Sequence, residues 1–169
     1  MKQKKGSKIV MLKKYLWIFL ISMVPIIELR GAIPYARGMG LPMLNAYIIA
    51  IIGNMIPVPF IYFFARKVLE WGADKPLIGG LFSWCLKKGE KGGRKLQASA
   101  GRGLFVALLL FVGIPLPGTG AWTGTLAASI LKMDFKSSVL AVMGGVLLAG
   151  IIMWCVSEGA FGALGMLLG

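Results

Sequence analysis

The 169 residues are 57% hydrophobic and only 15% charged, with a mean hydropathy of +0.80. Soluble domains carry roughly 25% charged residues, so this composition excludes an ordinary soluble protein and indicates an integral membrane protein. At ~20 residues per crossing, the chain is long enough for about four to six membrane segments. We expect a single membrane domain over residues 1–169.

The basic residues flank the apolar segments. The formal net charge is +13, and lysine and arginine cluster in residues 1–14 and 66–102. Flanks of this kind are cytoplasmic by the positive-inside rule. We therefore expect a basic cytoplasmic N-terminus, a basic amphipathic connection over residues 66–102, and contact with anionic lipid headgroups rather than nucleic acid.

The chain contains no histidine, and its two cysteines match no metal-binding spacing. We expect no metal, no cofactor and no enzymatic activity. Any proton chemistry would fall to the six acidic residues, which are Glu28, Glu70, Asp74, Glu90, Asp134 and Glu158.

The predicted membrane segments follow one another along the chain. The first, residues 15–27, has a signal-like basic flank but no small-residue cleavage site after it, so we expect it to be retained. Residues 41–65 are interrupted by "GNMIPVPF" and residues 104–131 by "GIPLPGTGAWTG", whereas residues 139–156 form an uninterrupted span and residues 159–169 a weak apolar tail.

Loop charge gives a topology. The N-terminus, residues 66–102 and residues 132–136 are all basic, so we expect each to be cytoplasmic. Residues 104–131 then begin and end on one side, and because two crossings need ~40 residues, they are predicted to form a re-entrant hairpin. The same parity requires an even number of crossings between Tyr15 and Ala65. Two arrangements meet this requirement. One is a pair of spans, and the other is a hairpin followed by two further crossings.

Three charges interrupt the first half of the apolar sequence. The stretch "VPIIELRGAIPYARGMGLP" contains Glu28, Arg30 and Arg37, and one interpretation is a water-exposed loop. The apolar run before it has only 13 residues, however, so a full span would draw these charges into the membrane. Each costs ~2.5–3.5 kcal/mol at the helix centre, whereas a strong apolar residue returns only ~0.3–0.6 kcal/mol. We expect the charges to avoid lipid, at an interface or in a polar cavity.

The residue types favour binding of an oxyanion. Two guanidinium groups match phosphate or carboxylate, and Glu28 would neutralise one of them in the empty state. In the second interrupted segment, hydroxyls and backbone amides at a helix start offer a further anion site. Asn54 is a lone amide within an apolar segment. The candidate substrate- or ion-binding residues are Glu28, Arg30, Pro34, Arg37, Asn54, Pro115, Pro117, Gly118, Thr119, Gly120, Trp122 and Thr123.

The two motifs echo each other, since "IPYARGMG" and "IPLPGTG" share I-P followed by G-x-G. Paired interrupted segments of this kind indicate a transporter site. On the motifs "ELRGAIPYARG" and "GIPLPGTGAWTG" the chain resembles the bacterial small multi-drug export protein family, which looks like a branch of the DedA-like (VTT domain) superfamily. That resemblance implies two opposed re-entrant hairpins and an anionic lipid carrier such as undecaprenyl phosphate. The chain departs from the DedA-like pattern because its acid and arginines all lie in the first motif.

Together these observations predict an all-α polytopic protein of the bacterial cytoplasmic membrane with two re-entrant broken-helix hairpins. We expect it to translocate an amphipathic anion such as a lipid phosphate, with coupling to H⁺ or Na⁺ through Glu28. The alternatives are a small multidrug or cation exporter and a non-transporting membrane scaffold. Gly145 and Ala149, spaced i and i+4, predict a face for close packing within the chain or in a homodimer.

Overall fold

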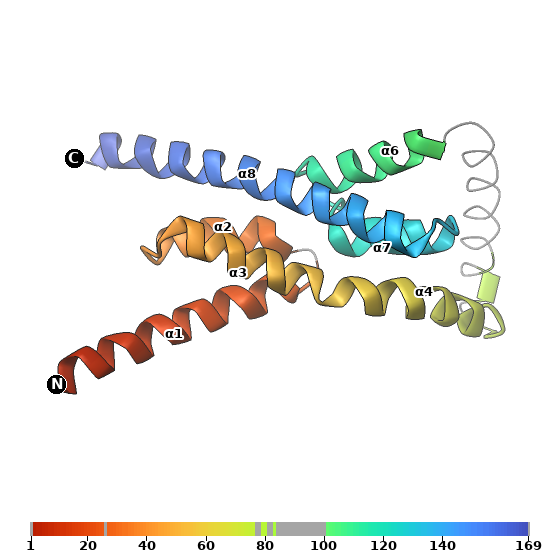
Figure 1. Ribbon diagram of the computed structural model, residues 1–169, viewed down its shortest axis with the longest axis horizontal. Helices are drawn as coiled ribbons and strands as arrows, with labels where there is room; N and C mark the ends of the chain where they lie inside the picture. The colour runs from red at the N-terminus through yellow and green to blue at the C-terminus, as the bar shows by residue number, and fades with distance from the viewer. Residues whose placement is uncertain (1, 26, 77–78, 81–82, 84–100, 169) are drawn as a thin grey trace.

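A computed structural model of the protein describes residues 2–25, 27–76, 79–80, 83 and 101–168 (Figure 1). Within these residues the chain forms seven helices and no strand, so the predicted all-α class is confirmed. The helices are α1 (Lys2–Met23), α2 (Glu28–Gly38), α3 (Met43–Met55), α4 (Pro57–Ala73), α6 (Gly101–Gly113), α7 (Ala121–Ile130) and α8 (Phe135–Leu168).

Proline and glycine separate the helices where the sequence places them. Pro57 begins α4, where its missing amide costs nothing, so α3 and α4 follow each other as one broken helix (Figure 1). Between α6 and α7, residues 114–120 leave the helical path at Pro115 and Pro117. Gly118 and Gly120 in this loop have φ of +81° and +137°, which residues other than glycine rarely adopt.

The helices form two hairpins and two long passages (Figure 1). Helix α1 runs inward and α2 turns back beside it, then α3 and α4 pass along the length of the molecule. Helix α6 runs inward from the opposite end, α7 turns back, and α8 returns along the whole length. The turns of the two hairpins therefore meet near the middle of the molecule.

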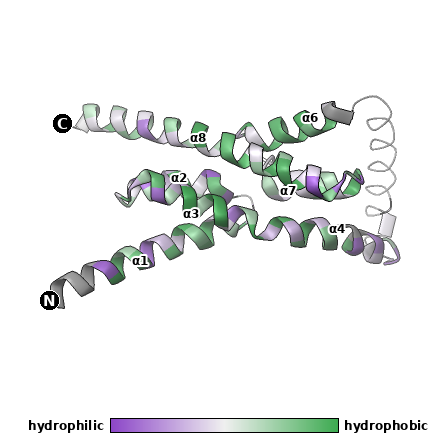
Figure 2. Cartoon of the chain, viewed as in Figure 1, coloured by the Kyte–Doolittle hydropathy of each residue, from purple (hydrophilic) through white to green (hydrophobic). Residues whose placement is uncertain are grey.

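Two of these passages are long and apolar enough to cross a membrane. Among the described residues they are Met43–Phe64, with a mean hydropathy of 1.9, and Phe135–Met166, with 2.5. Apolar residues dominate the long helices (Figure 2), and many large apolar side chains are exposed on the outer surface. Helix α8 contains the predicted span of residues 139–156, but the predicted weak tail continues the same helix to Leu168.

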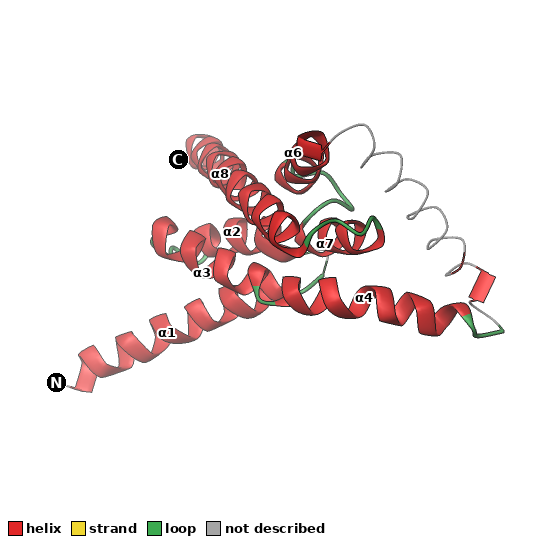
Figure 3. Cartoon of the chain, turned by 45° about the vertical axis from the view of Figure 1, so that its right-hand side comes forward, coloured by secondary structure: helices red, strands yellow, loops and turns green. Residues whose placement is uncertain are grey.

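Two of the basic stretches adjoin the start of α1 and the end of α4. Both views place the start of α1 and the end of α4 at opposite ends (Figures 1 and 3). The single passage of α3 and α4 lies between them, and the even number of crossings expected from loop charge stays a prediction. Of the predicted connection over residues 66–102, the first part continues α4 to Ala73, and residues 84–100 lie outside the described residues.

Small residues allow the helices to cross closely. A side chain at Gly53 would collide with Ser22 and with the Phe19 carbonyl, so α1 and α3 need glycine there. Gly145 of α8 lies equally close to Val112 and to the Leu109 carbonyl of α6. The face predicted from Gly145 and Ala149 is thus used for packing inside the chain, where both residues are buried.

Candidate functional site

Glu28 caps the start of α7. Its carboxylate accepts hydrogen bonds from the backbone N–H groups of Ala121, at 3.2 Å, and Trp122, at 3.0 Å. These amides belong to the first turn of a helix, which has no internal acceptors for them and carries partial positive charge. Glu28 is only 3% exposed, so its negative charge is compensated by the helix end rather than by water.

Arg30 plays the converse role at the end of α6. Its Nη1 donates to the carbonyls of Leu116 (2.5 Å) and Thr119 (2.7 Å). Its Nη2 donates to the carbonyls of Val112 (3.1 Å) and Ile114 (3.3 Å) and to the Thr119 hydroxyl (2.7 Å). The last carbonyls of a helix lack intrahelical donors and carry partial negative charge, which the guanidinium compensates.

Glu28, Arg30, the loop of residues 114–120 and the first turn of α7 therefore form one unit, which we call the junction. Glu28 and Arg30 are two residues apart in α2. Glu28 contacts the positive N-terminal end of α7, and Arg30 contacts the negative C-terminal end of α6. The pairing explains why the chain places charges in an apolar segment: they satisfy backbone groups that the ends of the broken helices leave without partners inside the molecule.

Glycine is required in the junction. At Gly120, where φ is +137°, a Cβ atom would overlap the carboxylate of Glu28. Thr119 completes the loop, because its hydroxyl accepts from Arg30 and lies 3.0 Å from the Ile114 carbonyl and 2.9 Å from the Leu116 carbonyl. The predicted residues Pro115, Pro117 and Gly118 all lie in this loop.

Arg37 lies elsewhere. Its Nε is 3.2 Å from Glu158 Oε1 on α8, and its guanidinium carbon is 5.7 Å from the ring centroid of Phe161. Seven residues of helix, about 10 Å, separate it from Arg30. The two arginines thus have different partners and are not brought together in this structure, and their shared contact with one headgroup stays a prediction. Pro34 lies between them within α2.

Asn54 joins the junction from α3. It is 2% exposed, and its Oδ1 is buried without a hydrogen-bond donor among the described residues. Together with Glu28 and Arg30 it lines a small enclosed space between α2, α3, α6, α7 and α8. The remaining lining residues are apolar and comprise Leu29, Val112, Ala121, Val146 and Ala149. The structure therefore brings three predicted site residues around one cavity.

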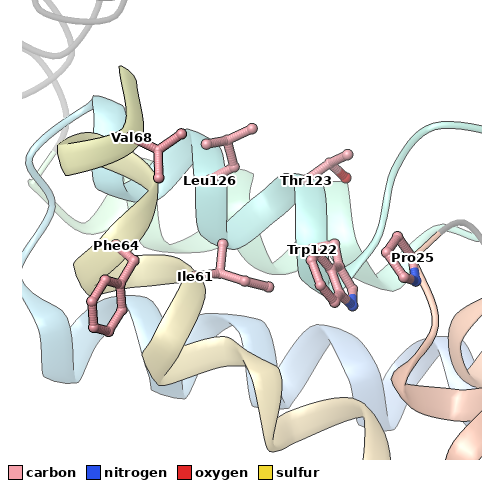
Figure 4. A pocket seen from close by; sticks show the side chains of 7 residues that line it. All are labelled: Pro25, Ile61, Phe64, Val68, Trp122, Thr123 and Leu126. Carbon is pink, nitrogen blue, oxygen red and sulfur yellow. The ribbon is translucent and has the colours of Figure 1, made fainter. Parts of the chain in front are cut away.

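An apolar groove of about 450 Å³ lies between α4 and α7 (Figure 4). Its lining residues are Pro25, Ile61, Phe64, Val68, Trp122, Thr123 and Leu126. Trp122 and Thr123 were predicted as site residues, but the other five were not. Apolar side chains on a membrane helix carry no sequence signal that separates a groove from a lipid-facing surface.

Trp122 connects the groove with the junction. Its backbone N–H donates to Glu28, and its indole Nε1 donates to the Met23 carbonyl at 3.2 Å. Its ring meanwhile lines the groove (Figure 4). Any movement of Glu28 that breaks the cap of α7 would therefore alter the wall of the groove.

The architecture is that of a helical integral membrane protein: two apolar helices are long enough to cross a membrane, and charges in the interior are paired with broken helix ends. The chain belongs to a family described as "Putative small multi-drug export protein", whose model matches residues 28–152. The match begins at Glu28 and includes both motifs, and it indicates an exporter rather than an enzyme. No curated protein and no solved structure matches the chain. The link to the DedA-like superfamily stays a prediction.

Proposed function

We propose that this protein exports small amphipathic cations across the cytoplasmic membrane, with the groove between α4 and α7 as the substrate site. In this proposal the long axis of the molecule lies along the membrane normal. Helices α3–α4 and α8 then cross the membrane, and the hairpins α1–α2 and α6–α7 are re-entrant from opposite faces. Such broken helices, meeting near the midplane, are the arrangement that builds transport sites.

The observation that carries the proposal is the chemistry of the groove. Its volume of about 450 Å³ falls within the range of ~300–1,000 Å³ typical of sites for small molecules. Phe64 and Trp122 contribute aromatic rings, and ring faces attract quaternary and other weakly hydrated cations. The described residues that line the groove are uncharged, so an apolar body is favoured, and the negative Glu28 accepts a hydrogen bond from the backbone of Trp122.

Binding of tetraphenylphosphonium to the purified protein tests this function. Phe64→Ala removes one aromatic wall and should weaken binding about tenfold, since loss of an aromatic contact in a desolvated pocket costs ~1–2 kcal/mol. Phe60→Ala is the matched control, because Phe60 is exposed one turn earlier on α4 and does not line the groove. Equal affinity in both variants and the wild type would place the substrate elsewhere.

Translocation of a lipid phosphate is the second candidate, and one observation favours it. Lys67 and Lys132 line a hollow of about 380 Å³ on the other flank of α4, together with Glu70. An anionic headgroup would suit this basic site near one end of the molecule. The junction supports it less, because both terminal nitrogens of Arg30 already donate to protein oxygens. A non-transporting scaffold would not require such a groove, so the groove favours a transporter over a scaffold.

A further inference from the structure

A polar hollow of about 380 Å³ lies on the other flank of α4 from the groove. Two cationic side chains line it, Lys67 from α4 and Lys132 from the turn after α7. The other residues lining it are Tyr62, Phe63, Glu70 and Ser129. The volume falls within the range of ~300–1,000 Å³ typical of sites for small molecules. The hollow therefore has room for a ligand, and its two lysines favour an anion.

Lys132 has a backbone conformation that favours glycine. It follows α7 with φ of +54°, and its amide donates to the Ser129 carbonyl at 3.2 Å, which closes the last turn of the helix. Helices that end in this way usually have glycine at this position, because a side chain is unfavourable there. Among the described residues, Glu28 is the only other non-glycine residue with positive φ, and it holds the junction. A lysine retained at such a position indicates that its side chain has a function.

Contacts between three elements fix the walls of the hollow. The Ser129 hydroxyl of α7 donates to the Tyr62 carbonyl of α4 at 2.7 Å. The Tyr62 hydroxyl donates to the Met133 carbonyl, and the Tyr62 ring packs against Phe135 with the ring centroids 5.1 Å apart. Helix α4, the end of α7 and the start of α8 are thus tied together. The backbone positions that carry the two lysines are therefore set before any ligand binds.

The surroundings of the lysines are those of a membrane surface. Phe63 and Phe64 of α4 are 53% and 56% exposed, and Lys67 Nζ lies 5.9 Å from the ring centroid of Phe64. Further along α4, Trp71 is 62% exposed, with Lys75 Nζ 4.5 Å from its ring centroid. Exposed aromatic rings together with lysine are typical of the level of the lipid headgroups. A ligand here would place an anionic group at the lysines and apolar chains along α4, which favours a lipid over free phosphate.

We propose that the hollow binds the headgroup of an anionic phospholipid whose phosphate is a singly charged diester, as in phosphatidylglycerol. Lys67, Lys132 and Glu70 together carry one net positive charge, which such a phosphate neutralises. A phosphate monoester carries about −1.5 to −2 charges at pH 7 and would leave excess negative charge beside Glu70. The hollow lies near one end of the molecule and the junction near its middle, so the lipid is a resident partner rather than the exported substrate (Figure 1). Its position at a membrane surface rests on the orientation proposed above.

Thermal unfolding of the purified full-length protein in a neutral detergent tests this site. Dioctanoyl phosphatidylglycerol is titrated, because a ligand that binds only the folded state raises the Tm in a saturable way. Three further titrations define the ligand. Dioctanoyl phosphatidylcholine tests the need for negative charge, dioctanoyl phosphatidic acid tests the need for a diester, and glycerophosphoglycerol tests the need for acyl chains.

The variants remove one cation at a time. Lys132→Gly also relieves the backbone at φ +54°, so without lipid its Tm should equal or exceed that of the wild type. Lys67→Gln removes the cation on α4. Lys136→Gln is the matched control, because Lys136 is an exposed lysine at the start of α8 that does not line the hollow.

We expect phosphatidylglycerol to stabilise the wild type and Lys136→Gln equally. Lys132→Gly and Lys67→Gln should each raise the half-saturating concentration about fivefold, which is the contribution of one lysine near an anionic headgroup. An undiminished response in either variant overturns the site, as does an equal response to phosphatidylcholine. An equal response to phosphatidic acid overturns the diester, and an equal response to glycerophosphoglycerol overturns the lipid.

Tetraphenylphosphonium binding in lipid-free samples reports on the groove separately. Neither Lys67 nor Lys132 lines the groove, so both variants should bind this probe as the wild type does. Failure of the lipid site and failure of the proposed export can therefore be told apart.

Discussion

Arg30 and Thr119 lie 89 residues apart in the sequence, yet the guanidinium of Arg30 donates to both the carbonyl and the hydroxyl of Thr119 at 2.7 Å. This contact ties the end of one broken helix to the start of another. It makes the two interrupted motifs a single structural unit. Arg30 could bind a substrate only after releasing its hydrogen bonds to this loop.

Replacement of Arg30 by lysine should therefore destabilise the protein itself. Lysine keeps the charge but offers three donors from one point, whereas five oxygens now receive hydrogen bonds from Arg30. Carbonyls left without donors should lower the free energy of unfolding by on the order of 2–4 kcal/mol. Thermal unfolding in detergent measures the loss.

Arg37→Lys provides the comparison for that experiment. Arg37 and Glu158 are 36% and 43% exposed, and ion pairs of this exposure contribute about 0–1 kcal/mol. The Tm of this variant should stay close to that of the wild type. If the two lysine variants lose the same stability, the hydrogen bonds of Arg30 do not hold the junction together.

Gly120→Ala should disrupt the junction from the other side. The new Cβ would overlap the Glu28 carboxylate, and the φ of +137° is unfavourable for alanine. We expect a loss of about 2 kcal/mol or more in unfolding free energy. Gly159→Ala is the control, because nothing lies near that helical glycine and alanine should stabilise α8 by roughly 0.5–1 kcal/mol. A Gly120→Ala protein as stable as the wild type would contradict the cap on α7.

Trp122→Phe separates the two contributions of Trp122. Phenylalanine keeps an aromatic ring in the groove but loses the indole donor to the Met23 carbonyl. We expect stability to fall by about 0.5–1.5 kcal/mol while tetraphenylphosphonium still binds. Trp122→Ala should lose both the stability contributed by the indole hydrogen bond and the binding of tetraphenylphosphonium. Were the phenylalanine variant unable to bind the probe although folded, the indole would contact the substrate through its nitrogen.

The position of the ends can be measured by cysteine labelling. In cells, Lys8→Cys in α1 and Lys132→Cys after α7 should react with a membrane-impermeant reagent from opposite sides, because the start of α1 and the end of α7 lie at opposite ends of the long axis (Figure 1). Both variants carry serine in place of Cys85 and Cys155. Labelling of both positions from one side would support the loop-charge topology and reject the orientation proposed here.

Much of the helical architecture can be read from the sequence, because proline and glycine act locally. Pro57, Pro115 and Gly120 interrupt helices where the pattern predicts. The partners of Glu28 and Arg30 could not be predicted, since they are backbone groups of a segment more than 80 residues away and carry no side-chain signature.

The groove escaped prediction for a different reason. Ile61 and Val68 have the composition expected of any lipid-facing helix, and only the packing of α4 against α7 makes them the wall of a groove. The loop-charge topology and the orientation proposed here differ because lysine and arginine are abundant both before α1 ends and after α4 begins, and the positive-inside rule places both stretches on one side.

The long separation between Glu28 and its partners also has a consequence during synthesis. At ~5–20 residues per second, the ribosome needs roughly 5–20 s after making Glu28 before it makes Ala121 and Trp122. For that time Glu28 and Arg30 lack the helix ends that compensate them in the folded protein, and lipid cannot replace those groups. The nascent first hairpin must therefore wait at the hydrated membrane surface or inside the insertion machinery. A ribosome stalled before residue 114 should leave the first hairpin open to water-soluble reagents.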